Sequence, residues 1–174
     1  SRLVGNGYGI LGRTVFEYRK LRRNLGRNVA DKVARDYTFW NGCCPIHDRI
    51  TCDMILDAKK RYPGCPVIIH PECRPEVVAL ADAALSTGGM LKFVSDSKAA
   101  EFIIGTEIGI LHRMRNENPG KKFYSLQPEL VCVDMKKITL ENLRDTMKNM
   151  TNEVVVDEDV AARARRAIEA MLAI

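Results

Sequence analysis

The sequence Val67-Ile68-Ile69-His70-Pro71-Glu72-Cys73-Arg74-Pro75-Glu76 contains the strand, the turn and the helix start that decide the fold class. Its β-branched run predicts a short buried strand, because the run is bounded by turn residues and is too short for a helix. Pro75 suits the first turn of a helix, where its missing N–H would have no partner in any case, and Glu76 adds charge that the helix dipole favours. A strand that leads directly into a helix is the unit from which parallel sheets are built.

The same alternation of short apolar runs with amphipathic stretches continues on both sides of this unit and predicts an α/β protein with parallel strands. We predict strands at residues 37–40, 67–69, 91–94, 102–104 and 122–124. We predict helices at residues 51–62, 75–85, 107–116, 139–150 and 157–174, with two shorter helices between residues 13 and 35. The last helix places Val160, Ile168 and Leu172 on one face, which we expect to lie in the core.

Length, composition and charge exclude several classes of protein. The chain has 174 residues, of which 46% are hydrophobic and 28% charged, so we expect one or two small folded domains. Its apolar runs are far shorter than the ~20 residues that cross a bilayer, and residues 1–12 lack an export or transit pattern, so we expect a cytoplasmic protein that does not bind membranes. A net charge of +5 favours small anionic ligands but is too dispersed to indicate nucleic-acid binding.

The spacing of the six cysteines disfavours a zinc ribbon and a redox dithiol, because no CxxC pair occurs among them. An iron–sulfur cluster can instead be held by cysteines far apart in sequence, each on a loop at the end of a strand. Cys43 and Cys44 directly follow the strand predicted at residues 37–40, and Cys132 precedes the helix predicted at residue 139. Burial as a small hydrophobic residue is the alternative for any single cysteine, and we assign Cys52 and Cys65 to it.

A histidine and a glutamate stand where the buried strand at residues 67–69 ends. In an open α/β sheet, ligands bind at the carboxyl ends of the strands, next to helix N-termini. His70 and Glu72 are two residues apart, so on an extended chain they point to the same side, where they could orient an anion and move protons. A purely structural role, as an ion pair or a helix cap, fits the same two residues equally well.

Six collinear motifs resemble the quinolinate synthase family, the iron–sulfur enzymes of NAD biosynthesis. They are Asn24-Leu25-Gly26, Trp40-Asn41-Gly42-Cys43-Cys44-Pro45-Ile46-His47, His70-Pro71-Glu72-Cys73-Arg74-Pro75-Glu76-Val77, Leu85-Ser86-Thr87, Phe102-Ile103-Ile104-Gly105-Thr106-Glu107-Ile108-Gly109-Ile110-Leu111-His112-Arg113 and Cys132-Val133-Asp134-Met135-Lys136-Lys137-Ile138-Thr139. The resemblance extends from residue 24 to the C-terminus, whereas residues 1–21 match nothing in the family.

The resemblance implies three similar three-layer α/β/α domains around a pseudo-threefold axis, each of which gives one cysteine to a central [4Fe–4S] cluster. This chain would contain two of those domains, residues 22–88 with Cys44 and His70-Pro71-Glu72, and residues 89–174 with Cys132 and the C-terminal helix. Cys44 and Cys132 are then two cluster ligands, and the third is expected in the missing N-terminal domain. Cys73 does not occupy a ligand position of the family.

The resemblance also implies a reaction, the condensation of iminoaspartate with dihydroxyacetone phosphate to quinolinate, with the cluster as Lewis acid. Glu72 matches the acid/base residue of the family, and His70 and Thr87 match substrate-binding residues. A functional link to an aspartate oxidase or dehydrogenase, which would supply iminoaspartate, follows from the same resemblance.

A rival hypothesis is a non-catalytic metal-binding or scaffold protein derived from the truncated fold, in which Cys44, Cys132 and Cys43 hold zinc or a labile cluster. Because a missing domain would leave apolar surface exposed, we expect the isolated chain to self-associate.

Overall fold

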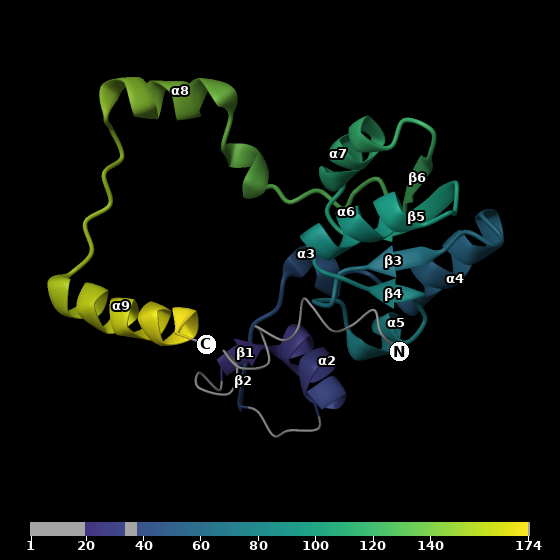
Figure 1. Ribbon diagram of the computed structural model, residues 1–174, viewed down its shortest axis with the longest axis horizontal. Coiled ribbons are helices and arrows are strands. Elements are labelled where there is room, and N and C mark those ends of the chain that lie inside the picture. Colours follow the sequence, from purple (N-terminus) through teal and green to yellow (C-terminus); the bar gives the residue numbers. More distant parts are fainter. Residues whose placement is uncertain (1–19, 34–37, 174) are drawn as a thin grey trace. The chain divides into compact units, whose positions relative to one another are not determined.

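The computed structural model describes residues 20–33 and 38–173 (Figure 1). The chain divides into two compact units between Val131 and Cys132. The segment without a family match, residues 1–21, lies almost entirely outside the described residues. No helix of the described part has both the length and the apolar character that crossing a membrane requires.

Four parallel strands form the main sheet of the first unit. They are β3 (Val67–Ile69), β4 (Ala83–Ala84), β5 (Glu101–Gly105) and β6 (Lys122–Ser125), in the order β4-β3-β5-β6. A separate parallel pair consists of β1 (Lys20–Arg22) and β2 (Thr38–Trp40). The predicted α/β class with small parallel sheets is therefore confirmed.

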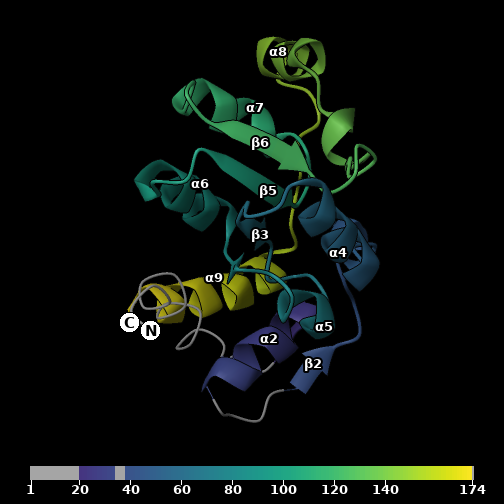
Figure 2. The same cartoon turned by 90° about the vertical axis from the view of Figure 1, so that its right-hand side faces the viewer.

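Helices cover both faces of the four-stranded sheet, which gives the three layers expected for such a fold (Figure 2). On one face, buried residues of α6 (Thr87–Asp96) and α7 (Ile110–Glu117) form one cluster with alternate residues of the strands. That cluster contains Ile68, Met90, Val94, Phe102, Ile104, Leu111, Met114 and Phe123. On the other face lie α4 (Cys52–Arg61) and α5 (Pro75–Val78). Both faces of the central strands are thus buried, as their continuous apolar runs require.

The chain leaves the two central strands, β3 and β5, in opposite directions. From β3 it passes through α5 to β4 at one edge, and from β5 it passes through α7 to β6 at the other edge. The carboxyl ends of β3 and β5 therefore border the point where the connection reverses, which is where open α/β sheets bind ligands. His70 follows β3 at this point and Thr106 follows β5.

The strand predicted at residues 91–94 is wrong, because these residues belong to α6. The side chain of Ser86 accepts a hydrogen bond of 3.3 Å from the backbone N–H of Gly89, so it caps a helix that begins at Thr87. Met90 and Val94, four residues apart, are both fully buried on its inner face.

The helix predicted at residues 75–85 is also too long. The observed helix, α5, ends at Val78, and Ala83 and Ala84 form β4 by pairing with Ile68 and Ile69. β3 and β4 precede the domain boundary expected at residue 88, and β5 and β6 follow it, although all four strands form one sheet. The division of the chain into family domains stays a prediction. Of the two short helices expected before residue 35, the described part contains one, α2 (Arg23–Val33).

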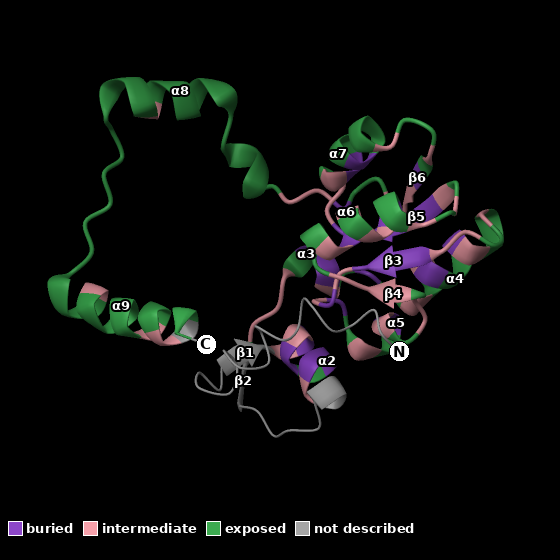
Figure 3. Ribbon diagram, in the orientation of Figure 1, coloured by how far each residue is buried: buried purple, intermediate pink, exposed green. Residues whose placement is uncertain are grey.

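The second unit contains a 3-10 turn, η1 (Met135–Lys137), and two helices, α8 (Leu140–Asn149) and α9 (Glu158–Leu172). Thr139 and Asn142 form a reciprocal cap at the start of α8. Within the second unit the apolar face of α9 does not lie in a core, since the exposed fractions of Val160, Ile168 and Leu172 are 46%, 54% and 81%. Figure 3 shows this exposure along α8 and α9.

Candidate metal and catalytic site

A cysteine and a histidine are placed on one side of the short helix α3 (Pro45–Asp48). Cys44 precedes the helix with extended backbone angles (φ −78°, ψ 119°), and Pro45 occupies the first helical position, where it needs no hydrogen bond. His47 follows Cys44 by three residues, a spacing that puts two side chains on the same side of a helical turn.

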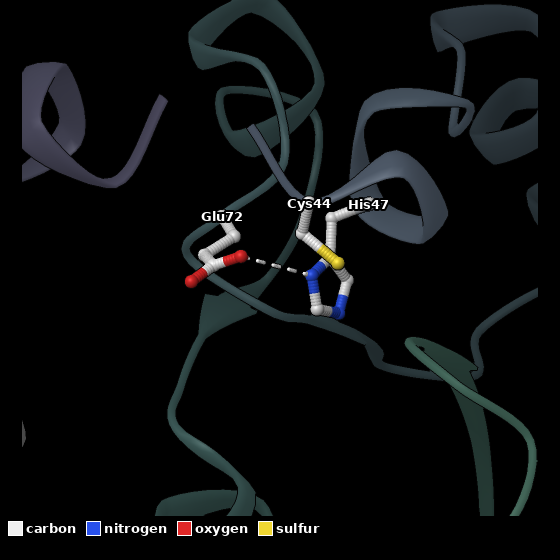
Figure 4. A group of neighbouring side chains, drawn as sticks. All are labelled: Cys44, His47 and Glu72. Carbon is white, nitrogen blue, oxygen red and sulfur yellow. Dashed lines mark ion pairs between the residues drawn. The ribbon is translucent and has the colours of Figure 1, made fainter. Parts of the chain in front are cut away.

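The turn after β3 brings Glu72 to these two side chains (Figure 4). One potential metal-binding atom from each of Cys44, His47 and Glu72 lies within 4.8 Å of the other two. The Oε2 atom of Glu72 is 3.6 Å from Nδ1 of His47, and both side chains are largely buried. A thiol, an imidazole and a carboxylate from segments far apart in sequence therefore converge at the carboxyl end of the sheet.

His47 contacts two further side chains of this sheet edge. Its Nε2 atom is 2.9 Å from Oγ1 of Thr106, the residue that follows β5. Its ring stacks on that of His70, with 4.3 Å between the ring centroids and 10° between the planes. Its Nδ1 atom has no hydrogen-bond partner among the described residues. Thr106 therefore fixes one ring nitrogen of His47, and the other faces the thiol and the carboxylate (Figure 4).

His70 is held as a neutral ring. Burial, reinforced by the neighbouring His47, lowers the pKa of His70 from 6.5 to about 4, although Glu72 opposes this shift. Its Nδ1 atom accepts a hydrogen bond of 3.2 Å from the backbone N–H of Glu72. The proton of the neutral ring is consequently on Nε2, which is the donor that His70 can offer to a ligand.

The turn that carries Glu72 is fixed by a buried amide of α2. The Nδ2 atom of Asn28 donates hydrogen bonds of 2.8 Å to the carbonyl oxygen of Pro71 and 2.9 Å to that of Cys73. These are the carbonyl groups on either side of Glu72. One side chain thus sets the path of the backbone through the candidate acid/base residue.

A charged cluster joins the segments that carry the site. Asp48, in α3, accepts hydrogen bonds of 3.1 and 3.0 Å from the guanidinium group of Arg74 and one of 2.9 Å from the amide of Asn24. Arg74 first, and then Asn24, hold the pKa of Asp48 at about 2, below its ordinary value of 3.8. The carboxylate of Asp48 therefore links three segments by hydrogen bonds: the start of α2, the helix that follows Cys44, and the turn that carries Glu72.

The structure brings together three of the five residues that the sequence suggested. Cys44, His70 and Glu72 meet at the edge of the sheet, whereas Thr87 is exposed at the start of α6 and no hydrogen bond between described residues joins it to them. Cys132 begins the second unit and is partly exposed. The roles expected for these five residues stay predictions.

Cys73 lies next to the site but is fully buried, and burial raises the pKa of its thiol to about 12. A thiol in that state is protonated at neutral pH and is a poor metal ligand.

Three site residues were missed by the sequence analysis: His47, Thr106 and Asn28. His47 could have been found, because a cysteine, a proline and a histidine in the order Cys44-Pro45-Ile46-His47 place the thiol and the ring on one side of a helix start. No local pattern marks Asn28 or Thr106, since each acts on a segment more than 40 residues away.

Comparison with known proteins identifies the family. A family model described as "Quinolinate synthetase A protein" matches residues 22–173. The quinolinate synthase of Methanoregula boonei is 48% identical over 152 residues, which are 87% of this chain and 50% of that protein. The quinolinate synthases of Desulforudis audaxviator and Clostridioides difficile are 47% and 41% identical, over 87% and 84% of this chain and 50% and 48% of their own lengths.

The matched region contains Cys44, His47, His70, Glu72, Thr87 and Cys132. The chain spans about half the length of the curated relatives that it matches. The family model nevertheless covers most of the chain, from residue 22 to residue 173. The chain therefore belongs to the quinolinate synthase family.

Proposed function

We propose that this chain supplies the middle and C-terminal domains of a quinolinate synthase, which condenses iminoaspartate with dihydroxyacetone phosphate and releases phosphate and water. The observation that carries the proposal is the convergence of Cys44, His47 and Glu72 at the carboxyl end of the sheet. This convergence occurs in a chain that is 41–48% identical to proteins named quinolinate synthase. As an enzyme of NAD biosynthesis it would act in the cytoplasm.

The cofactor that the family implies is a [4Fe–4S] cluster, and the described residues fit it in one respect. Cys44 is a free, partly exposed cysteine at the end of a loop that leads from a strand into a helix, and thiolates of this kind hold iron in such clusters. Cys132 would be a second ligand and the missing domain would supply a third. When bound, the cluster would supply a Lewis-acidic iron that polarises a substrate oxygen or nitrogen.

Glu72 is the proposed acid/base residue. Its carboxylate is 16% exposed and its Oε2 atom lies 3.6 Å from the imidazole of His47, so a proton taken from a substrate carbon can be held between two basic groups and returned. The buried amide of Asn28 keeps the turn in place while the carboxylate changes its charge.

His70 and Thr87 are the proposed substrate-binding residues. The Nε2–H group of the neutral His70 ring can donate to a carboxylate or phosphate oxygen without adding positive charge next to His47. Thr87 offers a hydroxyl group at the N-terminus of α6, where backbone N–H groups also favour anions. An aspartate oxidase or dehydrogenase would supply the iminoaspartate.

The test is a chimera in which residues 22–173 replace the matching half of the Methanoregula boonei quinolinate synthase. We expect the chimera to form quinolinate from enzymatically generated iminoaspartate and dihydroxyacetone phosphate. Glu72→Gln should lower the rate by roughly 100-fold or more, the scale of general acid/base catalysis, without changing the iron content. Glu76→Gln is the matched control, since Glu76 is an exposed glutamate of the next helix, and it should keep the parent rate.

Cys44→Ser in the same chimera should lower the iron content, whereas Cys52→Ser should not. A folded chimera that forms no quinolinate, or a Glu72→Gln variant with the parent rate, would contradict the proposal. Such a result would favour the rival hypothesis of a non-catalytic metal-binding protein.

A further inference from the structure

A thiol, a carboxylate and an ammonium group meet at the amino ends of three strands, at the sheet edge opposite to the candidate site. Cys65 lies two residues before β3, Glu101 begins β5 and Lys122 begins β6. Glu101 and Lys122 are register partners. The pairing of Val67 with Ile103 likewise brings Cys65 beside Glu101, two residues earlier along each segment. The strand order β3-β5-β6 therefore places the three side chains in one row, with Glu101 in the middle.

The carboxylate of Glu101 binds both of its neighbours. Its Oε1 atom accepts a hydrogen bond of 3.0 Å from Nζ of Lys122, and its Oε2 atom accepts one of 3.7 Å from the thiol of Cys65. The hydroxyl group of Tyr124 donates to the same Oε2 atom at 3.0 Å, and the ring of Tyr124 stacks on that of Tyr62. The carboxylate is thus fixed in place, with a thiol on one oxygen and an amine on the other.

Both outer groups of this row are accessible to a reagent. Cys65 is partly exposed, rather than buried as the sequence predicts. The side chain of Lys122 is 69% exposed. Its ammonium group is carried by a flexible stem of four carbons, so it can turn from the carboxylate toward the thiol. Two nucleophiles are therefore held next to each other at the surface by one carboxylate.

A thiol and an amine in this arrangement can transfer an acyl group in two steps. Cysteine is the stronger nucleophile, so Sγ of Cys65 first attacks the carbonyl carbon of an acyl thioester, and the carrier leaves as a thiol with the proton of Cys65. Nζ of Lys122 then loses one proton to solvent and attacks the new thioester. A C–N bond forms, the C–S bond breaks, and Sγ leaves with a second proton from Nζ. The thiol is regenerated, so no oxidant or reductant is needed, and the second step gains from proximity.

We infer that Lys122 is a modification site for small acyl thioesters, and that Cys65 receives the acyl group first and passes it on. Acylation removes the positive charge of Lys122 and with it the ion pair to Glu101, which is 3.0 Å long in the unmodified chain. The residues of the candidate metal and catalytic site take no part in the transfer. The inference therefore goes beyond the proposed function and does not rest on it.

The experiment incubates the reduced chain of 174 residues with acetyl-coenzyme A and follows the acetylation of each lysine by peptide mass spectrometry. The solution is mildly alkaline, because burial and then Glu101 raise the pKa of the Cys65 thiol. Lys92 is the matched control, since its side chain is 79% exposed and it pairs with a carboxylate, that of Asp96, at 2.8 Å. A hydrogen bond to the carboxylate raises the pKa of both lysines, but no described cysteine donates to Asp96.

We expect acetylation of Lys122 to be faster than that of Lys92 by roughly 10-fold or more, a small part of the gain that proximity can give. The difference should vanish in urea, where the strands no longer hold Cys65 beside Lys122. This comparison of two lysines within one unsubstituted chain does not depend on a variant folding.

Three variants separate the two steps. Cys65→Ser should lower the acetylation rate of Lys122 to that of Lys92, whereas Cys52→Ser, which removes another partly exposed cysteine, should leave it unchanged. Lys122→Arg keeps the charge but accepts no acyl group, so an acetyl thioester that hydroxylamine releases should accumulate on Cys65. Equal acetylation of Lys122 and Lys92 in the native chain, a Lys122 rate that Cys65→Ser does not change, or absence of the thioester in Lys122→Arg would overturn the inference. The experiment involves no cluster and no quinolinate, so its failure is distinct from failure of the chimera.

Discussion

Replacing Asn28 with alanine tests whether one buried amide holds the turn that carries Glu72. The side chain of Asn28 is nearly inaccessible, with an exposed fraction of 7% for the residue, and it donates to the carbonyl oxygens of Pro71 and Cys73 at 2.8 and 2.9 Å. Both acceptor residues are themselves buried. Water therefore has little access to the carbonyl groups that the substitution would leave without a donor.

The expected loss follows from those two bonds. Each hydrogen bond contributes about 0.5 to 1.5 kcal/mol net, and a buried acceptor left unpaired costs about 1 to 3 kcal/mol. Because the turn can relax and pair part of its carbonyls with water, we expect Asn28→Ala to lower the free energy of unfolding by about 2 to 4 kcal/mol. The same relaxation should lower the rate of quinolinate formation in the chimera, because Glu72 loses its fixed position.

The assay is urea unfolding followed by circular dichroism, combined with the rate of quinolinate formation in the chimera. Asn116→Ala is the matched control, since Asn116 is an exposed asparagine of α7 whose amide contacts the exposed His112. It should change the stability by less than about 0.5 kcal/mol. An Asn28→Ala variant that loses less than this amount of stability and forms quinolinate at the parent rate in the chimera would refute the positioning role of Asn28.

Two further predictions concern ionisable groups near the site. The pKa of Asp48 is about 2 in the folded chain against 3.8 ordinarily, so the stability it contributes is present above pH 4 and is lost as the pH falls toward 2. The loss amounts to about 2 kcal/mol of unfolding free energy. The Asp48→Asn variant already lacks this contribution, so its unfolding free energy should fall less than that of the parent chain when both are measured between pH 4 and pH 2. Cys73, fully buried and with its pKa raised to about 12, should resist alkylation by iodoacetamide at pH 8 until urea is added, and mass spectrometry that finds it modified in the native chain would contradict this.

Local sequence was sufficient where the physical cause is local. The run at residues 67–69, the proline at the start of α5 and the capping threonine before α8 each act within a few residues, so the strand and both helix starts are observed where the sequence predicts them. The position of His70 and Glu72 at the carboxyl end of a strand followed from the same reasoning. The family resemblance, which comparison confirms, suggested roles for Cys44 and Glu72, and these roles stay predictions.

Tertiary structure decided the elements whose local signals were ambiguous. Residues 91–94 are a short apolar run that fits a strand or a buried helix, and packing of Met90 and Val94 on the sheet selects the helix. Ala83 and Ala84 have weak strand preference and form β4 because β3 offers them free hydrogen-bonding groups at its edge.

The convergence of the site also depends on the tertiary structure, because its parts are far apart in sequence. Cys44 and His47 are neighbours on one helix start, so their pairing is encoded within four residues. Glu72 reaches them only because β3 ends beside α3, and Thr106 reaches His47 only because β5 pairs with β3 in parallel register. Residue types and local spacing thus determine which groups are available, and the strand order determines which of them meet, because only packing brings distant backbone segments within bonding distance.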